Sequence, residues 1–237
     1  MHLQPKRFVV NDANAELVNF YVAVRDAPED LCCAALSFDV NENTYYEIRA
    51  WDRDQSFLAR SSIDRAARFL YLNRTCFNGI WRVNAKSGYN NVPWGRPKPD
   101  KQVCDRDAVM HVSEYIAGCE RAEFHCGSFE LLESDMKQGD VVYFDPPYVP
   151  ISHGEAFVGY TKDGFAYDDQ VKLRDMCTRL DSNGVRWVLS NSWCDVVREL
   201  YDGFSIEQVD VNRLVAAKAT SRKQITEAIV TNIRKPR

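Results

Sequence analysis

The chain has 237 residues and a mass of 27.2 kDa, which suits one large domain or a domain with an inserted lobe. Hydrophobic residues make up 45% and charged residues 27%, a balance that excludes intrinsic disorder and collagen-like order. The net charge of −4 hides two basic segments, residues 74–101 and 213–237. An acidic body with basic segments can bind a polyanion locally.

Neither a membrane protein nor a disulfide-rich secreted protein is indicated. No apolar run approaches the ~18 residues that a membrane helix needs, and residues 1–10 lack the apolar core of a signal peptide. Eight cysteines scattered through a chain of this size are typical of reduced cytosolic thiols. We therefore expect a cytoplasmic protein without a membrane partner.

The first third of the chain is predicted to contain one strand followed by helices. Residues 8–10 form a short run with strand character. Apolar side chains recur at helical spacing over residues 17–24, and Asp12 or Asn14 can cap that helix. Residues 63–72 show the same helical pattern.

Residues 73–100 differ in character from what precedes them. They are rich in Asn, Gly, Pro and Arg, with aromatic residues interleaved and no clean period. A long irregular stretch is usually functional or disordered, and the aromatic residues argue against disorder. We therefore expect a functional segment here.

Strands alternate with helices in the second half. A Gly-containing loop is expected over residues 149–164. Strands are predicted over residues 122–126, 140–144, 185–189, 205–211 and 225–231, and helices over 168–180 and 194–201. This alternation predicts an α/β fold with helices on both faces of a sheet. Such sheets bind ligands beyond the carboxyl ends of their strands.

The segment Asp145-Pro146-Pro147-Tyr148 directly follows a predicted buried strand. An exocyclic nucleobase amine is a poor nucleophile, because its lone pair is delocalised into the ring. The Asp145 carboxylate and the rigidly held Pro146 carbonyl can accept hydrogen bonds from its N–H groups and stabilise developing positive charge. Tyr148 can stack on the base, which must first be flipped out of a duplex. A diproline turn with an Asp cap is the alternative interpretation.

Here the sequence resembles a known family. Asp-Pro-Pro-Tyr is similar to the catalytic motif of amino-group methyltransferases that use S-adenosylmethionine, although alone it also suits methylation of cytosine N4, RNA or glutamine. Residues 72–84 (LNRTCFNGIWRVN) and 89–96 (YNNVPWGR) resemble the target-recognition lobe of Dam-type DNA N6-adenine methyltransferases, the alpha group of the D12 class. The order of lobe before motif also matches, and the resemblance runs from about residue 8 to about residue 232.

The resemblance implies a fold and an activity. The fold is a Rossmann-like S-adenosylmethionine-dependent methyltransferase sheet with a mainly helical recognition insertion. Residues 1–40 and 112–237 would form the catalytic domain, and residues 41–111 the recognition lobe. The expected enzyme is a monomer that methylates N6 of a flipped-out adenine in double-stranded DNA. The resemblance suggests the site 5′-GATC-3′, and the biological setting is expected to be bacterial or phage, in restriction-modification or another role.

The resemblance also implies site residues. For the cofactor S-adenosylmethionine, Asp12 would bind the ribose hydroxyls, and Ser128 and Phe129 would flank the adenine. Asp145 would also be a cofactor-binding residue. Asp145, Pro146 and Tyr148 would hold the target base. In the lobe, Arg74 would contact phosphate, as would Lys86 and Lys98. Phe77 and Asn78 would lie beside the extruded base, Arg82 would contact a base edge, and Asn91, Pro93 and Arg96 would belong to a DNA-contacting hairpin.

One part of the family pattern does not occur in this sequence. The family carries a Phe-x-Gly-x-Gly motif after its first strand, whereas the first glycine here is Gly79. We expect Met1 to correspond to an internal methionine of a longer gene, with the first strand unit missing. A degenerate remnant that binds DNA without catalysis, and a separate polypeptide that supplies the unit, are the alternatives.

Other chemistries find less support. His111, Cys119, His125 and Cys126 are close in sequence but lack the paired spacing of a zinc site, so no metal is expected. A cytosine C5 methyltransferase would need a Cys after Pro147, where Tyr148 stands. The sequence has no Gly-x-x-x-x-Gly-Lys phosphate loop, so ATP hydrolysis is not indicated.

Overall fold

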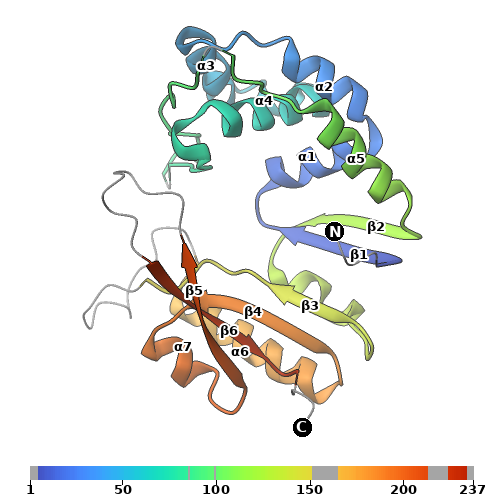
Figure 1. Cartoon of the computed structure of the whole chain (residues 1–237), viewed down its shortest axis with the longest axis vertical. Coiled ribbons are helices and arrows are strands. Elements are labelled where there is room, and N and C mark those ends of the chain that lie inside the picture. The colour runs from blue at the N-terminus through green and yellow to red at the C-terminus, as the bar shows by residue number, and fades with distance from the viewer. Residues whose placement is uncertain (1–4, 85, 99, 151–164, 213–223, 234–237) are drawn as a thin grey trace. The chain divides into compact units, whose positions relative to one another are not determined.

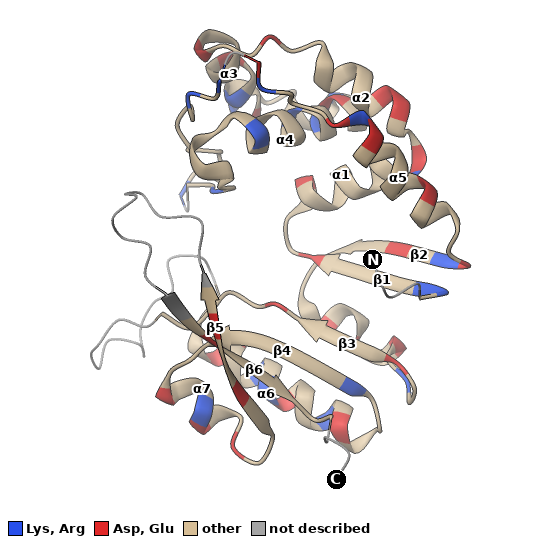
Figure 2. Ribbon diagram, viewed as in Figure 1, with Lys and Arg blue, Asp and Glu red and all other residues tan. Residues whose placement is uncertain are grey.

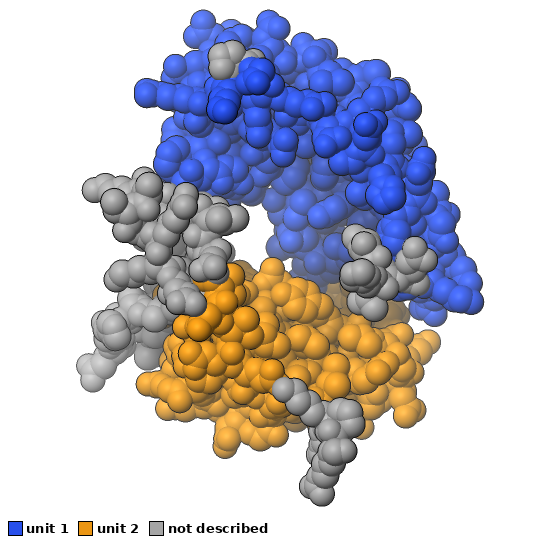
Figure 3. Space-filling view, viewed as in Figure 1, with its two compact units in different colours: residues 1–129 blue, residues 130–237 orange. Residues whose placement is uncertain are grey.

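A computed structural model describes residues 5–84, 86–98, 100–150, 165–212 and 224–233 (Figure 1). The chain divides into two compact units, residues 1–129 and 130–237 (Figure 3). Each unit is defined by the contacts that its residues make with one another. The predicted division, into a catalytic domain of residues 1–40 and 112–237 and a recognition lobe of residues 41–111, has other boundaries and stays a prediction.

The first unit contains a two-stranded parallel sheet. β1 (Arg7–Asp12) and β2 (Arg121–Cys126) pair along their full length, with Asp12 opposite Cys126 at the end of the register. Both predicted strands are confirmed. Because the pairing is parallel, the carboxyl ends of two strands far apart in the sequence lie side by side.

Helices make up most of the rest of this unit. They are α1 (Ala15–Asp26), α2 (Pro28–Leu36), α3 (Glu42–Arg49), α4 (Ser62–Thr75) and α5 (Arg106–Ala117), with 3₁₀ turns η1 (Ala50–Arg53), η2 (Phe57–Ala59) and η3 (Phe77–Gly79). The helices predicted over residues 17–24 and 63–72 are confirmed as parts of α1 and α4. Asn14 is the cap of α1, because its side chain accepts hydrogen bonds from the backbone N atoms of Glu16 and Leu17.

The helix α4 contributes to two hydrophobic clusters. Its Ala66 and Ala67 are buried in a cluster with α1, α2 and α5, and side chains of β1 and β2 pack against this cluster. One to two turns later, Tyr71 and Leu72 are buried in a second cluster with α3 and the segment that follows α4. The same helix therefore packs on the sheet side and on the side of the predicted recognition segment.

The second unit contains a four-stranded mixed sheet in the order β3-β4-β6-β5. Its strands are β3 (Val141–Phe144), β4 (Arg186–Ser192), β5 (Ser205–Asn212) and β6 (Gln224–Thr231), its helices are α6 (Tyr167–Ser182) and α7 (Asp195–Leu200), and η4 (Phe129–Asp135) leads into it. β3 and β4 are parallel, and β6 is antiparallel to both β4 and β5. These predicted strands and helices are all confirmed as elements. The expectation that the strand before Asp145 is buried is wrong: β3 lies at the edge of its sheet, and Val141 and Tyr143 expose 59% and 63% of their surface while Phe144 is buried.

Apolar side chains of α6 pack against β4 in the core of this unit. Leu173, Met176 and Leu180 are fully buried at helical spacing, and Trp187 and Leu189 of β4 are buried as well. After α6, Gly184 adopts a φ of 71°, which a glycine provides without strain. From residue 151 onward, the predicted loop over 149–164 lies outside the described residues.

The strands and helices make the protein a mixed α/β protein. The described strands form two sheets, one in each unit, and a single Rossmann-like sheet stays a prediction. Within the described ranges, no helix is long and apolar enough to span a bilayer.

Candidate active site and nucleic-acid interface

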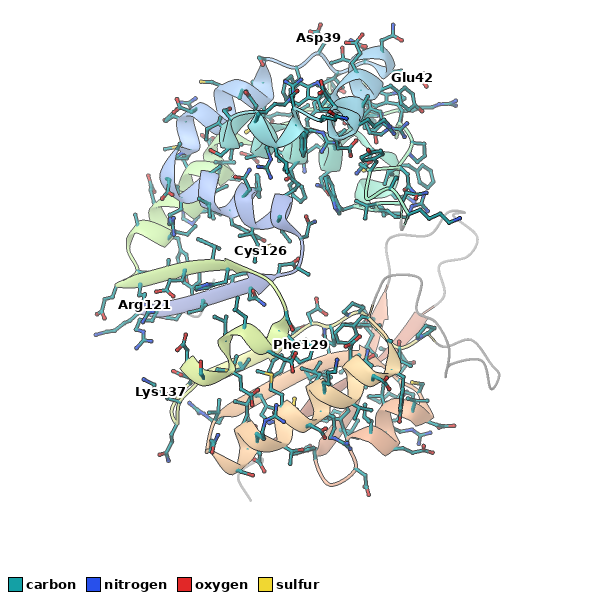
Figure 4. All side chains as sticks on the ribbon, turned by 180° about the vertical axis from the view of Figure 1, so that it is seen from behind. Asp39, Glu42, Arg121, Cys126, Phe129 and Lys137 are labelled. Carbon is teal, nitrogen blue, oxygen red and sulfur yellow. The ribbon has the colours of Figure 1, made fainter. Side chains whose placement is uncertain are left out.

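The carboxyl ends of β1 and β2 bring the predicted cofactor residues Asp12 and Ser128 together. The side chain of Asn11 donates hydrogen bonds to the backbone oxygens of Gly127 at 3.2 Å and Ser128 at 3.0 Å. This ties the turn after β2 to the end of β1. Figure 4 labels Cys126 and Phe129, which bracket the turn.

The Asp12 carboxylate is oriented by its own backbone surroundings. Its Oδ1 accepts a hydrogen bond from the backbone N of Asn14 at 2.6 Å. Its other oxygen makes no hydrogen bond within the described part of the chain. A carboxylate at a strand end fits a ribose diol, whose two hydroxyls need acceptors. Ser128 is exposed and Phe129 half-buried in the adjoining turn, where an aromatic ring suits contact with a nucleobase.

The predicted catalytic segment begins where β3 ends. Asp145 is exposed, and its Oδ1 accepts a hydrogen bond from the Ser190 hydroxyl at 2.9 Å. The other Asp145 oxygen and the Pro146 carbonyl make no hydrogen bond within the residues that the structure describes. Two acceptors at a strand end are therefore available to a substrate N–H group.

Tyr148 is held at its hydroxyl. That group donates to Oε2 of Glu227 on β6 at 3.2 Å. Burial is the main cause that raises the pKa of Tyr148, and the negative charges of Asp145 and Glu227 raise it further. A hydrogen bond with Ser190 lowers the pKa in part. The phenol therefore stays protonated at neutral pH. The hydrogen bond from its hydroxyl to Glu227 restrains the ring.

A buried pair of amides holds the turn after the prolines. Gln170 of α6 donates to the Pro147 carbonyl at 2.8 Å. Asn191 donates to Gln170 Oε1 at 3.2 Å and accepts from the backbone N of Val149 at 2.9 Å. Both amide side chains are buried. They satisfy backbone groups that would otherwise lack partners.

Sequence reasoning missed the residues that support this segment. Ser190, Asn191 and Ser192 are polar residues at the end of an otherwise apolar strand, and that change of character was an available signal. Gln170 and Glu227 carry no comparable signal. Gln170 lies in the amphipathic pattern of α6, and Glu227 in the alternating pattern of β6.

The segment that follows α4 forms an open hairpin. Isolated bridges pair Cys76 with Trp94 and Val83 with Asn90. Across it, Arg82 Nε donates to Asn91 Oδ1 at 2.8 Å. Arg82 is exposed and Asn91 half-buried. The structure thus joins two predicted DNA-contacting residues into one side-chain pair.

Two other predicted DNA-contacting residues have unusual backbones. Asn78 has a φ of 56° and Arg96 a φ of 52°, in the left-handed region that few non-glycine residues adopt. Such outliers cluster at functional sites. Phe77, beside Asn78, exposes 40% of its surface, and Pro93, whose carbonyl accepts from the Phe77 backbone N at 3.0 Å, is exposed too.

A cavity of about 750 Å³ lies between the end of α4 and residues 95–102. Arg74, Asn78, Lys98 and Lys101 contribute to its lining, which suits a phosphate group. The helices differ in charge (Figure 2): the charged residues of α2 are all acidic, whereas α4 carries three Arg against one Asp. The predicted phosphate contacts Arg74 and Lys98 thus share one basic cavity, while Lys86 lies in the exposed hairpin turn.

The described residues contain no group of three or more His, Cys, Asp or Glu side chains placed to hold a metal ion. The described ranges include His111, Cys119, His125 and Cys126.

The Asp-Pro-Pro-Tyr segment at a strand end and the basic, aromatic hairpin each fit the expectation of a methyltransferase that acts on amino groups of nucleic acids. Comparison with known proteins gives the family. The model of the D12 class N6 adenine-specific DNA methyltransferases matches residues 1–215. The chain belongs to this family and is an adenine-specific DNA methyltransferase. Membership implies S-adenosylmethionine as the methyl donor and DNA as the substrate.

Several curated relatives match nearly the whole chain. It is 43% identical to the Type II methyltransferase M1.LlaDCHI of Lactococcus lactis, over 97% of this chain and 81% of the relative. It is 33% identical to the Type II methyltransferase M.MjaIII of Methanocaldococcus jannaschii, over 96% and 80%. It is 30% identical to a DNA adenine methylase of Vibrio cholerae, over 94% and 79%.

Proposed function

We propose that this methyltransferase modifies N6 of an adenine flipped out of a short site in double-stranded DNA, such as 5′-GATC-3′. The observation that carries the proposal is the exposed Asp145 carboxylate, which accepts a hydrogen bond from Ser190 and is followed by the Pro146 carbonyl, an acceptor without a partner among the described residues. An exocyclic amine presents two N–H groups, and these two acceptors match them.

The residues of the segment act on the adenine amine in distinct ways. Asp145 and Pro146 accept hydrogen bonds from N6, which favours a pyramidal nitrogen whose lone pair can attack. S-adenosylmethionine supplies the methyl group when it is bound. The sulfur–methyl bond of the donor would break as the N6–methyl bond forms, and the donor would leave as a neutral thioether. The Asp145 carboxylate stabilises the positive charge on nitrogen, and one N6 proton then passes through Asp145 to solvent. Tyr148 stacks on the base.

Residues of the first unit would bind the cofactor. Asp12 would accept hydrogen bonds from the ribose hydroxyls, and Ser128 and Phe129 would flank the adenine ring. The support for these roles is the shared strand end at which β1 and β2 present the three residues.

The hairpin and the basic cavity would bind DNA, as the recognition lobe of residues 41–111. Arg82 would contact a base edge, and Asn91, Pro93 and Arg96 would contact DNA from the same hairpin. Arg74, Lys86 and Lys98 would contact phosphates without reading sequence. The exposed Phe77 and its neighbour Asn78 would occupy the space left by the extruded adenine. The names of the lactococcal and archaeal relatives support a role in a type II restriction-modification system.

The test is methyl transfer from labelled S-adenosylmethionine to unmethylated duplexes with GATC or a scrambled sequence. We expect label on adenine N6 of the GATC duplex, and its loss in Asp145→Ala. Asp202→Ala, which removes an exposed carboxylate from the turn after α7, is the matched control and should retain activity. Salt-sensitive DNA binding without label would contradict the catalytic proposal and leave a DNA-binding protein. Label on the scrambled duplex alone would contradict the GATC assignment.

A further inference from the structure

An ion pair between a buried arginine and a half-buried aspartate supports the hairpin that carries Arg82 and Asn91. The Arg68 side chain in α4 is 1% exposed, and its Nη2 lies 2.8 Å from Oδ2 of Asp52. The same Asp52 oxygen accepts a hydrogen bond from the backbone N of Asn90 at 2.7 Å. The ion pair therefore reaches the residue that precedes Asn91.

Arg68 makes further contacts that fix its direction. Its Nε donates to the Ile48 carbonyl at 2.9 Å, and its Nη2 donates to the Arg49 carbonyl at 2.9 Å. Burial lowers the pKa of Arg68, and the charge of Asp52 acts in the opposite direction. A buried charge is costly unless it is paired and hydrogen-bonded. The pair is thus held on one side by the end of α3 and on the other by the hairpin.

The hairpin backbone is anchored on both sides of Asn91. Besides the contact at Asn90, the Val92 carbonyl accepts hydrogen bonds from the Tyr45 hydroxyl and from Arg49 Nη1, each at 2.8 Å. Asn90 and Val92 are both buried. Only the intervening Asn91 directs its side chain to Arg82.

The Arg82–Asn91 pair has a geometry that suits recognition of a base. Nε of Arg82 is occupied by Asn91 Oδ1 at 2.8 Å, whereas its two terminal nitrogens bond no residue in the described part of the chain. An arginine contacts guanine O6 and N7 in a bidentate manner. Holding the guanidinium before DNA arrives lowers the ordering cost of binding.

We propose that Asp52 and Arg68 are positioning residues for sequence recognition. They fix Asn90, Asn90 fixes Asn91, and Asn91 directs Arg82 at one base. This inference rests on the proposed DNA-binding role of the hairpin. It assigns the ion pair to discrimination between sequences. Beyond their own pair, the hydrogen bonds of Asp52 and Arg68 within the described residues go to Asn90 and to the end of α3, and none goes to the proposed phosphate contacts Arg74 and Lys98.

The test measures discrimination directly. Each variant is mixed with a pool of DNA duplexes randomised over a central stretch, and the bound fraction is sequenced. Asp52→Asn should reduce the enrichment of the preferred site roughly tenfold, the size expected when one base contact is lost. Affinity for a scrambled duplex, and its dependence on salt, should stay at the wild-type level, because both report phosphate contacts. Asn91→Ala should reproduce this pattern.

A control separates positioning from mere stability. Ile116→Ala removes a buried side chain from the cluster beside β1 and β2 without touching the hairpin, and should lower the melting temperature while leaving the enrichment unchanged. If Asp52→Asn does not fold, Asp52→Glu keeps the negative charge beside Arg68 but shifts the carboxylate by one methylene from the backbone N of Asn90, and should lower the enrichment in the same way.

Each outcome decides the inference. Wild-type enrichment in a folded Asp52→Asn protein overturns it, as does an equal loss of affinity for preferred and scrambled duplexes, or a loss of enrichment in Ile116→Ala. A wild-type protein that enriches no sequence overturns the proposed sequence-specific function itself, and the inference with it.

Discussion

Ser190 donates its hydroxyl hydrogen to Asp145, and it accepts one from the Tyr143 hydroxyl at 3.0 Å. The register of β3 on β4 produces this arrangement. Phe144 lies opposite Leu189, so the next residue on each strand, Asp145 and Ser190, meets its counterpart just beyond the paired stretch. The chain of hydroxyls ends on one carboxylate oxygen and leaves the other for a substrate.

Ser190→Ala should slow methyl transfer without unfolding the protein. A hydrogen bond to a charged group contributes about 1.5 to 3 kcal/mol, so we expect a decrease of about tenfold or more in the single-turnover rate. Ser182→Ala removes an exposed hydroxyl whose partner in the described part of the chain is the Thr178 carbonyl, and it should have no effect. Equal rates for the two variants would show that Ser190 does not act through Asp145.

Asn191→Leu should destabilise the protein. The substitution leaves the buried backbone N of Val149 and one end of Gln170 without their partner. An unsatisfied buried polar group costs about 1 to 3 kcal/mol, and the urea midpoint measures this loss. Asn183→Leu, at the exposed end of α6, should shift the midpoint far less. A midpoint for Asn191→Leu that matches this control would contradict the role of the amide pair.

Gly95→Ala should displace the hairpin from α4. A Cβ at this position would lie 2.3 Å from the Cys76 carbonyl oxygen, and neighbouring backbone cannot move without losing the bond between Gly95 N and Thr75 O at 2.9 Å. We expect a loss of about 2 kcal/mol in the free energy of unfolding, measured by urea denaturation. Gly118→Ala meets its nearest atoms at 3.5 Å and serves as the control that should remain close to wild type.

Glu133→Gln should alter the acid limb of the stability profile. The hydrogen bonds from Arg179 lower the pKa of Glu133 below its usual 4.5. The pair therefore stabilises the fold above that value, and the stabilisation disappears as the pH falls through the lowered pKa. For a partly exposed pair, we expect the variant to be about 0.5 kcal/mol less stable at neutral pH. The difference should vanish in acid, and a constant difference at all pH values would refute the assignment.

The sequence predicted those parts of the fold that local patterns determine. β3 and α6 follow from a short apolar run and from helical spacing. In α3, by contrast, only Tyr45 and Ile48 are buried, one turn apart, which is too little periodicity to mark a helix. Similarly, α5 buries only Ser113 and Ile116. These two helices depend on tertiary packing and were not predicted.

The candidate site divides in the same way. Asp12 and Asp145 were predicted because each ends a strand and belongs to a family pattern. The ion pair of Asp52 with Arg68 was not, because an arginine in an amphipathic helix is ordinarily exposed. Its burial depends on carbonyl groups of α3, about twenty residues earlier, and no local pattern records such a pairing.

The helix α4 has a consequence for engineering chimeras. Ala66 and Ala67 pack with the helices beside β1 and β2, while Tyr71 and Leu72 pack beneath the hairpin. Exchanging residues 41–111 for those of a relative would replace the hairpin. It would also replace the α4 side chains that pack in the cluster beside β1 and β2. Donor and recipient must therefore agree at the sheet-facing positions of this one helix. Exchanging only residues 76–96 leaves α4 unchanged. The recipient's Arg68 and Asp52 then remain in place to bond the backbone of the new hairpin.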